Sequence, residues 1–254
     1  MSNPKARWQG RHPKKDELRQ SVWSELESSG AAVGSPWSAI PNFVGAQVAA
    51  ARLAELPEWQ AAKVVKTNPD AAQAWVRLLA LEQGKRLYTP VPELVRDFPF
   101  LLLDPEALQA ANIPFTEVMY ADGFIKHGKR VSFAEIEPLD FCVVGCVAVT
   151  PAGGRTGKGA GFADLELGLF RHYGVVSDST PIATTVHDIQ VVDNELVVMQ
   201  EHDTPLDYIA TPERLLATHT HYATPGPMDW SALQPDQYLN IPFLADLRAE
   251  LVGG

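Results

Sequence analysis

Hydrophobic residues recur at helical spacing in the first quarter of the sequence. Apolar positions fall about every four residues over 14–26, directly after Pro13, and this pattern predicts a helix. An alanine-rich run predicts a second helix over 44–56, which Pro57 stops. The prolines, glycines and serines of residues 31–42 predict a loop between the two helices.

The pattern then changes to alternating strands and helices. Residues 63–67 and 86–91 are β-branched enough to predict strands, and they flank a helical pattern over 71–83. Such alternation is typical of a parallel sheet with helices on its faces. Ligands of these folds gather at the carboxyl ends of the strands, where the turn 68–70 lies.

Other segments give individual predictions of secondary structure. We expect a strand at 101–103, a short helix at 105–111, a hairpin-like turn at 124–129, one buried strand at 141–150, a strand over 181–188, a β-rich region over 191–199, a strand running from 208 to 216, and a last short helix within 239–251. We expect an α/β domain over 1–217, with residues 1–57 packing on it as helices, and a proline-rich extension over 218–254.

Composition and charge narrow the class of partner. The 254 residues carry a net charge of −10, which argues against a general nucleic-acid or polybasic membrane surface. No apolar run approaches the length of a membrane span, and the first 15 residues lack the apolar region of a signal peptide. Cys142 and Cys146 are predicted as buried thiols on one face of one strand. We therefore expect a cytoplasmic protein, monomer or homodimer, with a small-molecule partner.

A basic glycine-rich loop is the strongest chemical signal. Five glycines lie between Gly153 and Gly161, together with Arg155 and Lys158, after a predicted strand and before a predicted helix. Glycine allows backbone N–H groups to approach an oxyanion, and a helix N-terminus favours negative charge. Asp164 stands where a carboxylate could hold Mg²⁺ against phosphates, although a plain surface turn would also use this composition.

The remaining polar groups leave alternatives open. Lys15 and Arg19 lie on one helix face, and from their spacing alone a solvated basic edge is favoured. The pairs His187/Asp188 and His202/Asp203 suit acid–base chemistry, metal binding or capping. His219 and His221 alternate, but no third ligand is spaced for zinc, so they are taken as surface residues.

Three motifs, in order along the chain, resemble those of 5-formyltetrahydrofolate cyclo-ligases (5,10-methenyltetrahydrofolate synthetases). Residues 155–164 (RTGKGAGFAD) are similar to the family's Arg-Leu-Gly-x-Gly-x-Gly-Tyr-Tyr-Asp loop, residues 15–19 to its Lys-x-x-Leu-Arg, and residues 202–209 to its His-Asp-x-x-hydrophobe-Asp stretch. Stretches such as 65–70 (VKTNPD) resemble a divergent branch, the methenyltetrahydrofolate synthetase domain-containing proteins.

The resemblance implies a three-layer α/β/α fold, with a mostly parallel central sheet, that closes a ring with ATP and Mg²⁺. It implies conversion of 5-formyltetrahydrofolate to 5,10-methenyltetrahydrofolate with release of ADP and phosphate, a step of one-carbon metabolism. The implied nucleotide-binding residues are Lys15, Arg19, Arg155, Thr156, Gly157, Lys158, Gly159, Ala160 and Gly161, with Lys15, Arg155 and Lys158 in catalytic roles, Asp164 and Asp203 as metal ligands, and Asp70, Phe162 and Ala163 on the substrate side.

Three departures from the family pattern fall on the substrate side. Phe162 and Ala163 stand where the family has paired tyrosines, and Asp70 stands where it has a glutamate. They leave three hypotheses: a cyclo-ligase for 5-formyltetrahydrofolate, an ATP-dependent enzyme for another formamide or amide (one related to thiamine, for example), and a non-catalytic nucleotide or folate sensor. Retained Asp164 and Asp203 favour an enzyme over a sensor.

Overall fold

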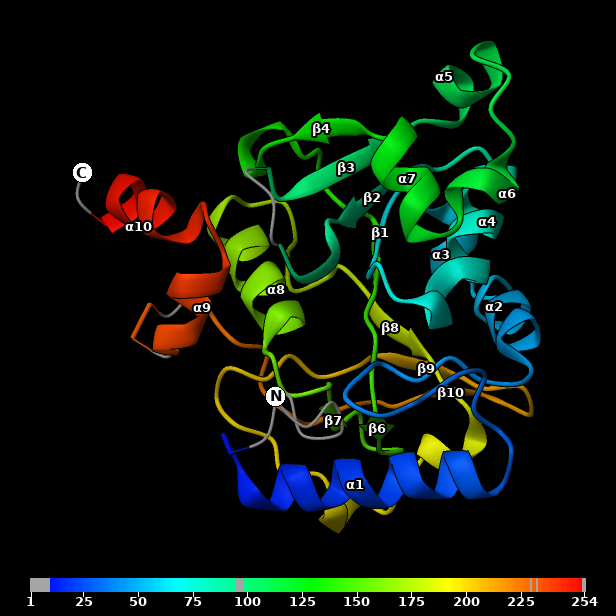
Figure 1. The fold of residues 1–254 in the computed structure, drawn as a ribbon, viewed down its shortest axis with the longest axis vertical. Helices are drawn as coiled ribbons and strands as arrows, with labels where there is room; N and C mark the ends of the chain where they lie inside the picture. Colours follow the sequence, from blue (N-terminus) through cyan, green and yellow to red (C-terminus); the bar gives the residue numbers. More distant parts are fainter. Residues whose placement is uncertain (1–9, 95–97, 229, 232, 253–254) are drawn as a thin grey trace.

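The computed structural model describes residues 10–94, 98–228, 230–231 and 233–252. Its largest feature is an eight-stranded sheet with the order β10-β9-β8-β5-β1-β2-β3-β4 (Figure 1). The strands are β1 (Val64–Thr67), β2 (Arg86–Pro90), β3 (Phe100–Leu103), β4 (Lys129–Val131), β5 (Phe141–Val143), β8 (Ile182–Thr185), β9 (Tyr208–Ala210) and β10 (Leu215–Ala217). The five neighbours β9, β8, β5, β1 and β2 run parallel, and the outer strands pair antiparallel.

Helices cover both faces of this sheet. One face packs against α8 (Phe162–His172), α9 (Pro235–Asn240) and α10 (Leu244–Val252). The other face packs against α2 (Ala46–Leu53), α3 (Pro57–Ala61), α4 (Ala74–Glu82), α5 (Pro105–Ala110), α6 (Phe115–Val118) and α7 (Ala121–His127). Figure 1 shows these two groups on opposite sides of the strands, so the predicted three-layer α/β/α class with a mostly parallel sheet is confirmed.

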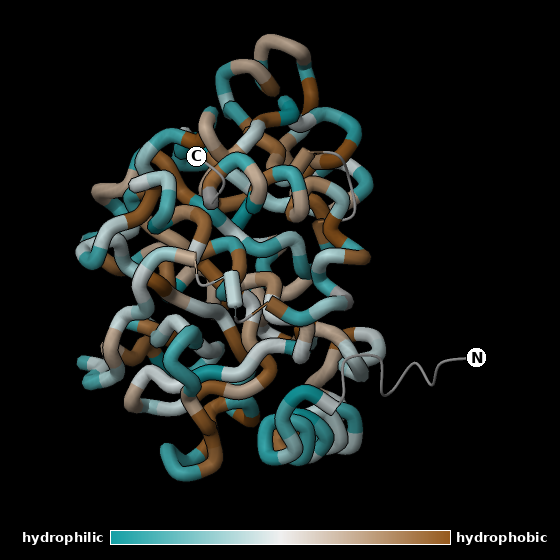
Figure 2. Tube along the Cα trace, turned by 90° about the vertical axis from the view of Figure 1, so that its left-hand side faces the viewer, coloured by the Kyte–Doolittle hydropathy of each residue, from teal (hydrophilic) through white to brown (hydrophobic). Residues whose placement is uncertain are grey.

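The first helix, α1 (Pro13–Ser28), lies beside the small hairpin of β6 (Ala148–Val149) and β7 (Arg155–Thr156). Its turns are largely hydrophilic in Figure 2, while Val22, Trp23 and Leu26 are buried in a cluster with residues of the hairpin. That cluster fixes α1 next to the glycine-rich loop that follows β7.

Four predictions of secondary structure were wrong. Residues 141–150 form β5 and β6, because the chain leaves the sheet at Gly145, where a Cβ would come within 3.0 Å of Ile40 and Asp70. Residues 208–216 form a β-hairpin, because Pro212 follows Thr211, whose hydroxyl accepts the N–H groups of the next turn.

The other two errors concern residues 124–129 and 191–199. Residues 124–127 form the last turn of helix α7, because Ala121, Phe124 and Ile125 share one face that packs on the core, and the chain then passes through Gly128 into β4. Residues 191–199 contain a 3₁₀ turn and a single bridge from Val191 to Val149 in place of a β-rich region. Both cysteines are free and buried, but Cys146 lies outside the strand that holds Cys142.

Within the described residues, every helix falls short of the length and apolarity that crossing a bilayer requires.

A buried arginine fixes the turn at the end of β1. Arg77 of α4 is fully buried and donates to the carbonyl oxygens of Asn68 (2.5 Å), Asp70 (3.0 Å) and Met119 (2.8 Å). We predict that Arg77→Met lowers the free energy of unfolding by about 3–5 kcal/mol, because it leaves buried carbonyls without donors. Urea denaturation followed by circular dichroism measures this change.

The matched control is Arg86→Met, which removes an arginine whose ion pair with Glu137 is largely exposed. We expect a loss of about 1 kcal/mol or less for that variant. Equal losses for the two variants would contradict the role given to Arg77.

Candidate functional site

A cavity of about 460 Å³ opens beyond the carboxyl ends of β1 and β5. Its walls come from α1, the turn after β1, the glycine-rich loop, the start of α8, residues 200–203 and the segment 225–237. All of the residues predicted for the site line it: Lys15, Arg19, Asp70, Arg155, Thr156, Gly157, Lys158, Gly159, Ala160, Gly161, Phe162, Ala163, Asp164 and Asp203. The fold therefore brings together motifs that lie up to 188 residues apart.

The glycine-rich loop joins β7 to α8. Gly159 (φ +109°) and Gly161 (φ +78°) have left-handed backbone that disfavours any residue with a Cβ. Arg19 Nε donates to the Gly157 carbonyl at 2.6 Å, and Arg11 Nη1 donates to the Ala160 carbonyl at 2.8 Å. Two cations from the start of the chain thus hold the loop at the mouth of α8, where the helix N-terminus favours an anion.

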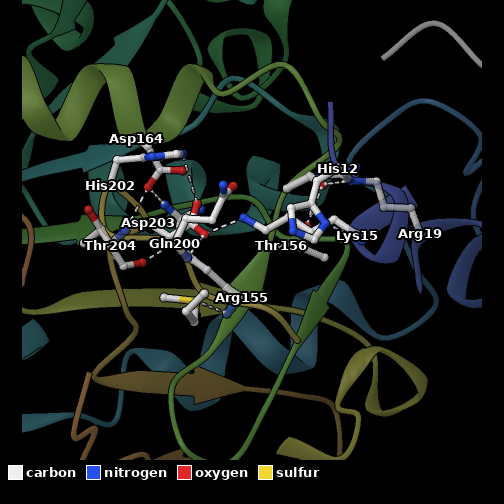
Figure 3. A network of polar contacts seen from close by, with 12 residues as sticks. His12, Lys15, Arg19, Arg155, Thr156, Asp164, Gln200, His202, Asp203 and Thr204 are labelled. Atoms are coloured by element: carbon white, nitrogen blue, oxygen red, sulfur yellow. Dashed lines mark hydrogen bonds and ion pairs between the residues drawn. The ribbon is translucent and has the colours of Figure 1, made fainter. Parts of the chain in front are cut away.

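Arg155 is enclosed by the chain itself. It is 2% exposed, donates from Nε to the Thr204 carbonyl at 2.6 Å, and pairs through Nη2 with Asp164 (Figure 3). Burial lowers the pKa of Arg155, but the Asp164 carboxylate raises it, and the net direction is upward. The side chain therefore stays a guanidinium, and its Nε and Nη2 donors position Thr204 and Asp164. A direct contact with phosphate stays a prediction.

Asp164 is linked to Asp203 through Thr204, the residue that follows Asp203 in the chain. Asp164 Oδ1 accepts the Thr204 N–H at 2.9 Å as well as Arg155 Nη2. Asp203 Oδ2 accepts the Gln200 N–H at 2.7 Å and pairs with Lys15 Nζ (Figure 3). Each carboxylate thus has one oxygen engaged by the chain.

The second oxygens fit a magnesium ion. Among the described residues, hydrogen bonds fall on Oδ1 of Asp164 and on Oδ2 of Asp203, and His202 Nε2 lies 3.8 Å from Asp203 Oδ1. Within the part of the chain that the structure describes, no cluster of three or more His, Cys, Asp or Glu side chains could hold a metal alone. Mg²⁺ suits such a site, since it binds one or two carboxylates together with phosphate oxygens and water.

Lys15 and Arg19 are not a solvated edge, so the interpretation from spacing alone was wrong. They are 7% and 6% exposed and point from α1 toward the cavity (Figure 3). Burial lowers the pKa of Arg19, and the adjacent Asp16 partly restores it. His12 caps α1 by accepting the Lys15 N–H, which aligns the helix start with the glycine-rich loop.

The three residues that depart from the family pattern, Asp70, Phe162 and Ala163, all line the cavity. Asp70 lines the cavity, and burial raises the pKa of its carboxyl. Lys158 Nζ lies 3.9 Å from Glu93 Oε1 and 5.6 Å from the centre of the Phe162 ring. Phe162 and Ala163 pack partly against the hydrophobic core.

The two His-Asp pairs separate in the structure. His202 and Asp203 line the cavity, whereas His187 caps a 3₁₀ turn through Nδ1, and Asp188 accepts the Thr211 hydroxyl. The capping interpretation therefore applies to the first pair along the chain. His221 stacks on Tyr222 and lies outside the cavity lining, as does His219.

Sequence reasoning missed the C-terminal wall of the cavity. Met228 donates its N–H to the Gly168 carbonyl of α8 at 3.2 Å, and Gln237 Nε2 donates to the Ala160 carbonyl at 3.3 Å. A Cβ on Gly168 would lie 3.3 Å from Met228 Cα, so the glycine permits this close approach. A glycine inside the helical pattern of 162–172 was the available signal.

It also missed four charged residues. Arg11, Arg171 and Glu166 line the cavity, and Glu166 is paired with the buried Lys66 of β1. In the sequence, Lys66 looks like an exposed residue of a short strand. Its burial and its pairing with Glu166 become visible only in the tertiary structure.

Comparison with known proteins identifies the family. The model of the 5-formyltetrahydrofolate cyclo-ligase family matches residues 11–212. The chain therefore belongs to this family, as its motifs predicted. The methenyltetrahydrofolate synthase domain-containing proteins of Bos taurus and Mus musculus are 35% and 36% identical to it over 236 residues, 92% of this chain.

The matches also differ in how much of each chain they cover. The chain spans about three fifths of the length of those curated relatives. The NMR structure of Aquifex aeolicus 5,10-methenyltetrahydrofolate synthetase covers 87% of this chain and 99% of its own, with a TM-score of 0.51 and 19% identity. That similarity concerns the fold.

The raised pKa of the Asp70 carboxyl predicts a pH-dependent difference in stability. Since its folded-state pKa is raised above 3.8, the folded protein binds more protons than the unfolded chain as pH rises past this value, and stability falls. Asp70→Asn cannot lose stability in this way. We predict that the free energy of unfolding of Asp70→Asn, taken relative to that of wild type, increases from about pH 3.8 up to the raised pKa. Above the raised pKa this difference should stay constant.

Urea denaturation across this pH range tests the effect, with Asp178→Asn, at an exposed position, as the control. A difference between Asp70→Asn and wild type that does not change with pH would show that the carboxyl is not perturbed.

Proposed function

We propose that the chain is an ATP- and Mg²⁺-dependent cyclo-ligase that converts 5-formyltetrahydrofolate to 5,10-methenyltetrahydrofolate in the cytoplasm. The observation that carries the proposal is the convergence of all three family motifs on one cavity. A volume of about 460 Å³ is within the range of small-molecule sites. A mixed lining of cations and carboxylates suits a triphosphate with a metal ion.

The reaction proposed for this site has two bond exchanges. The formyl oxygen takes the γ-phosphoryl group as ADP leaves. The neighbouring folate nitrogen then bonds to the activated carbon, and the C–O bond breaks as phosphate leaves and takes up the proton of that nitrogen. Such transfers depend on positioning and charge neutralisation more than on a protein base. Bound Mg²⁺ would neutralise phosphate charge during the transfer.

The residues of the chain then have three roles. Lys15, Lys158 and Arg19 present positive charge to phosphates, together with the N–H groups of the glycine-rich loop. Asp164 and Asp203 would hold the metal ion through Oδ2 and Oδ1, the oxygens to which no described residue donates a hydrogen bond. Arg155 keeps Asp164 oriented, and Lys15 does the same for Asp203.

A second candidate is an ATP-dependent enzyme of the same family that activates a different formamide or amide. The observation that favours it is that all three departures, at Phe162, Ala163 and Asp70, are cavity-lining residues that the family resemblance assigns to the substrate. The phosphate part keeps the family pattern.

Formation of the methenyl-folate chromophore tests the first proposal directly. We predict absorbance growth from 5-formyltetrahydrofolate that requires both ATP and Mg²⁺ and stops with EDTA. Asp203→Asn should lower kcat/KM at least about a hundredfold, since a misplaced metal ion disrupts positioning. Exposed Asp178→Asn is the control and should retain wild-type turnover.

The outcome also separates the two candidates. Turnover of about 10⁴ M⁻¹s⁻¹ or above supports the folate cyclo-ligase. ATP binding without chromophore formation contradicts it and supports the second candidate, and Phe162→Tyr, Ala163→Tyr and Asp70→Glu together should then raise folate turnover without changing ATP affinity.

A further inference from the structure

The peptide bond between Ala160 and Gly161 is the last one of the glycine-rich loop before α8 begins. Its carbonyl oxygen accepts two hydrogen bonds, from Arg11 Nη1 at 2.8 Å and from Gln237 Nε2 at 3.3 Å. Arg11 precedes the first family motif, and Gln237 lies beyond residue 212, where the family model ends. Two side chains from near the ends of the described chain therefore fix the orientation of one peptide in the loop.

Gln237 is itself held in place. Its side chain is buried, and its Oε1 accepts the Gln234 N–H at 2.8 Å, which directs Nε2 toward Ala160. The chain after α9 is anchored by Ile241 and Leu244, which are 0% exposed and belong to the hydrophobic cluster on α8. Both polar atoms of the Gln237 amide are therefore used, one to cap α9 and one to hold the glycine-rich loop.

The loop needs this hold because glycine allows the peptide to turn over. Rotation of the peptide between Ala160 and Gly161 changes the ψ angle of Ala160 and the φ angle of Gly161. Gly161 has a φ of +78°, and without a Cβ it adopts either sign of φ at similar cost. Such a rotation would put the carbonyl oxygen where the N–H group now lies. The loop would then present a negative partial charge in place of a positive one to an anion.

In the observed orientation the Gly161 N–H is left for a ligand. The peptide bonds of the described residues are all trans, so this N–H points away from the Ala160 carbonyl and from its two donors. No described residue accepts it, and Gly161 lines the cavity. Gly161 is also the N-cap of α8, where the helix dipole favours negative charge. A phosphate oxygen is an acceptor that suits this donor.

We propose that Gln237 is a positioning residue: together with Arg11 it holds the Ala160 carbonyl, so that the Gly161 N–H faces a phosphate group in the cavity. The inference rests on the proposed function, because it concerns the phosphate end of the ligand in the same cavity. Arg11 lines the cavity as a cation and acts on an anion through its charge as well. Gln237 is neutral, so its contribution comes through the hydrogen bond alone.

Calorimetric titration of inorganic tripolyphosphate tests the proposal. The titrant is added to wild type, to Gln237→Met, which keeps the length of the side chain but cannot donate, and to the control Gln109→Met. Gln109 is exposed on α5, outside the cavity lining. We expect Gln237→Met to weaken binding about 3- to 10-fold, the scale of one neutral hydrogen bond, because Arg11 still holds the carbonyl. Gln109→Met should bind as wild type does, and so would Gln237→Met if the proposal is wrong.

Nuclear magnetic resonance separates positioning from a general structural effect. The amide proton of Gly161 should move downfield when tripolyphosphate binds to wild type, since an anionic acceptor makes a strong hydrogen bond. In Gln237→Met saturated with tripolyphosphate this shift should be smaller, while the amide of Val65 in the core keeps its wild-type position. Should Gln237→Met fail to fold, the titration of wild type still decides, because an unmoved Gly161 signal overturns the proposal.

The remaining outcomes are distinct. Weaker binding by Gln237→Met, without a shift of the Gly161 signal in wild type, would leave Gln237 a structural role only and overturn the proposal. Wild type that binds no tripolyphosphate would overturn it too. None of these measurements uses a folate or depends on turnover, so the cyclo-ligase assay succeeds or fails separately.

Discussion

Arg155 is charged and almost completely buried, so contacts within the protein must replace its hydration. Its guanidinium meets the Thr204 carbonyl and the Asp164 carboxylate, and Thr204 donates in turn to the same carboxylate. This triangle ties β7, the start of α8 and the turn at 203–204 into one unit. Because removing any member would leave a buried charge or carbonyl unpaired, the geometry of Asp164 is determined by the fold rather than by a ligand.

The same constraint explains why the site is assembled from distant parts of the chain. Lys15 pairs with Asp203, and Arg19 donates to Gly157, so α1 is attached to the glycine-rich loop and to the 203–204 turn by charge as well as by its apolar stripe. Such pairs preorganise the cavity, since little reorientation is needed when a charged ligand arrives. The three family motifs are far apart in the sequence, and each supplies residues to a different part of the cavity lining.

The sequence predicted much of this organisation, for identifiable reasons. Helical spacing located α1, and the alternation around 63–91 located β1, α4 and β2. The glycine-rich loop was recognisable because its backbone requires residues without a Cβ. The break at Gly145 was not predictable, since it arises from the approach of Ile40 and Asp70. Glu166 and Lys66 were missed for the same reason: each is an ordinary charged residue until the sheet and α8 pack together.

The C-terminal wall has a consequence for inhibitor chemistry. The part of the chain shared with the family model ends at residue 212, and Met228 and Gln237 reach the cavity from beyond it. A compound that takes its affinity from phosphate-like groups would act on many family members, because the glycine-rich loop is common to them. A compound that also packs on Met228 and bonds to the Gln237 amide would owe part of its affinity to side chains outside the shared domain. Any selectivity gained in this way would come from residues beyond the segment that the family model matches.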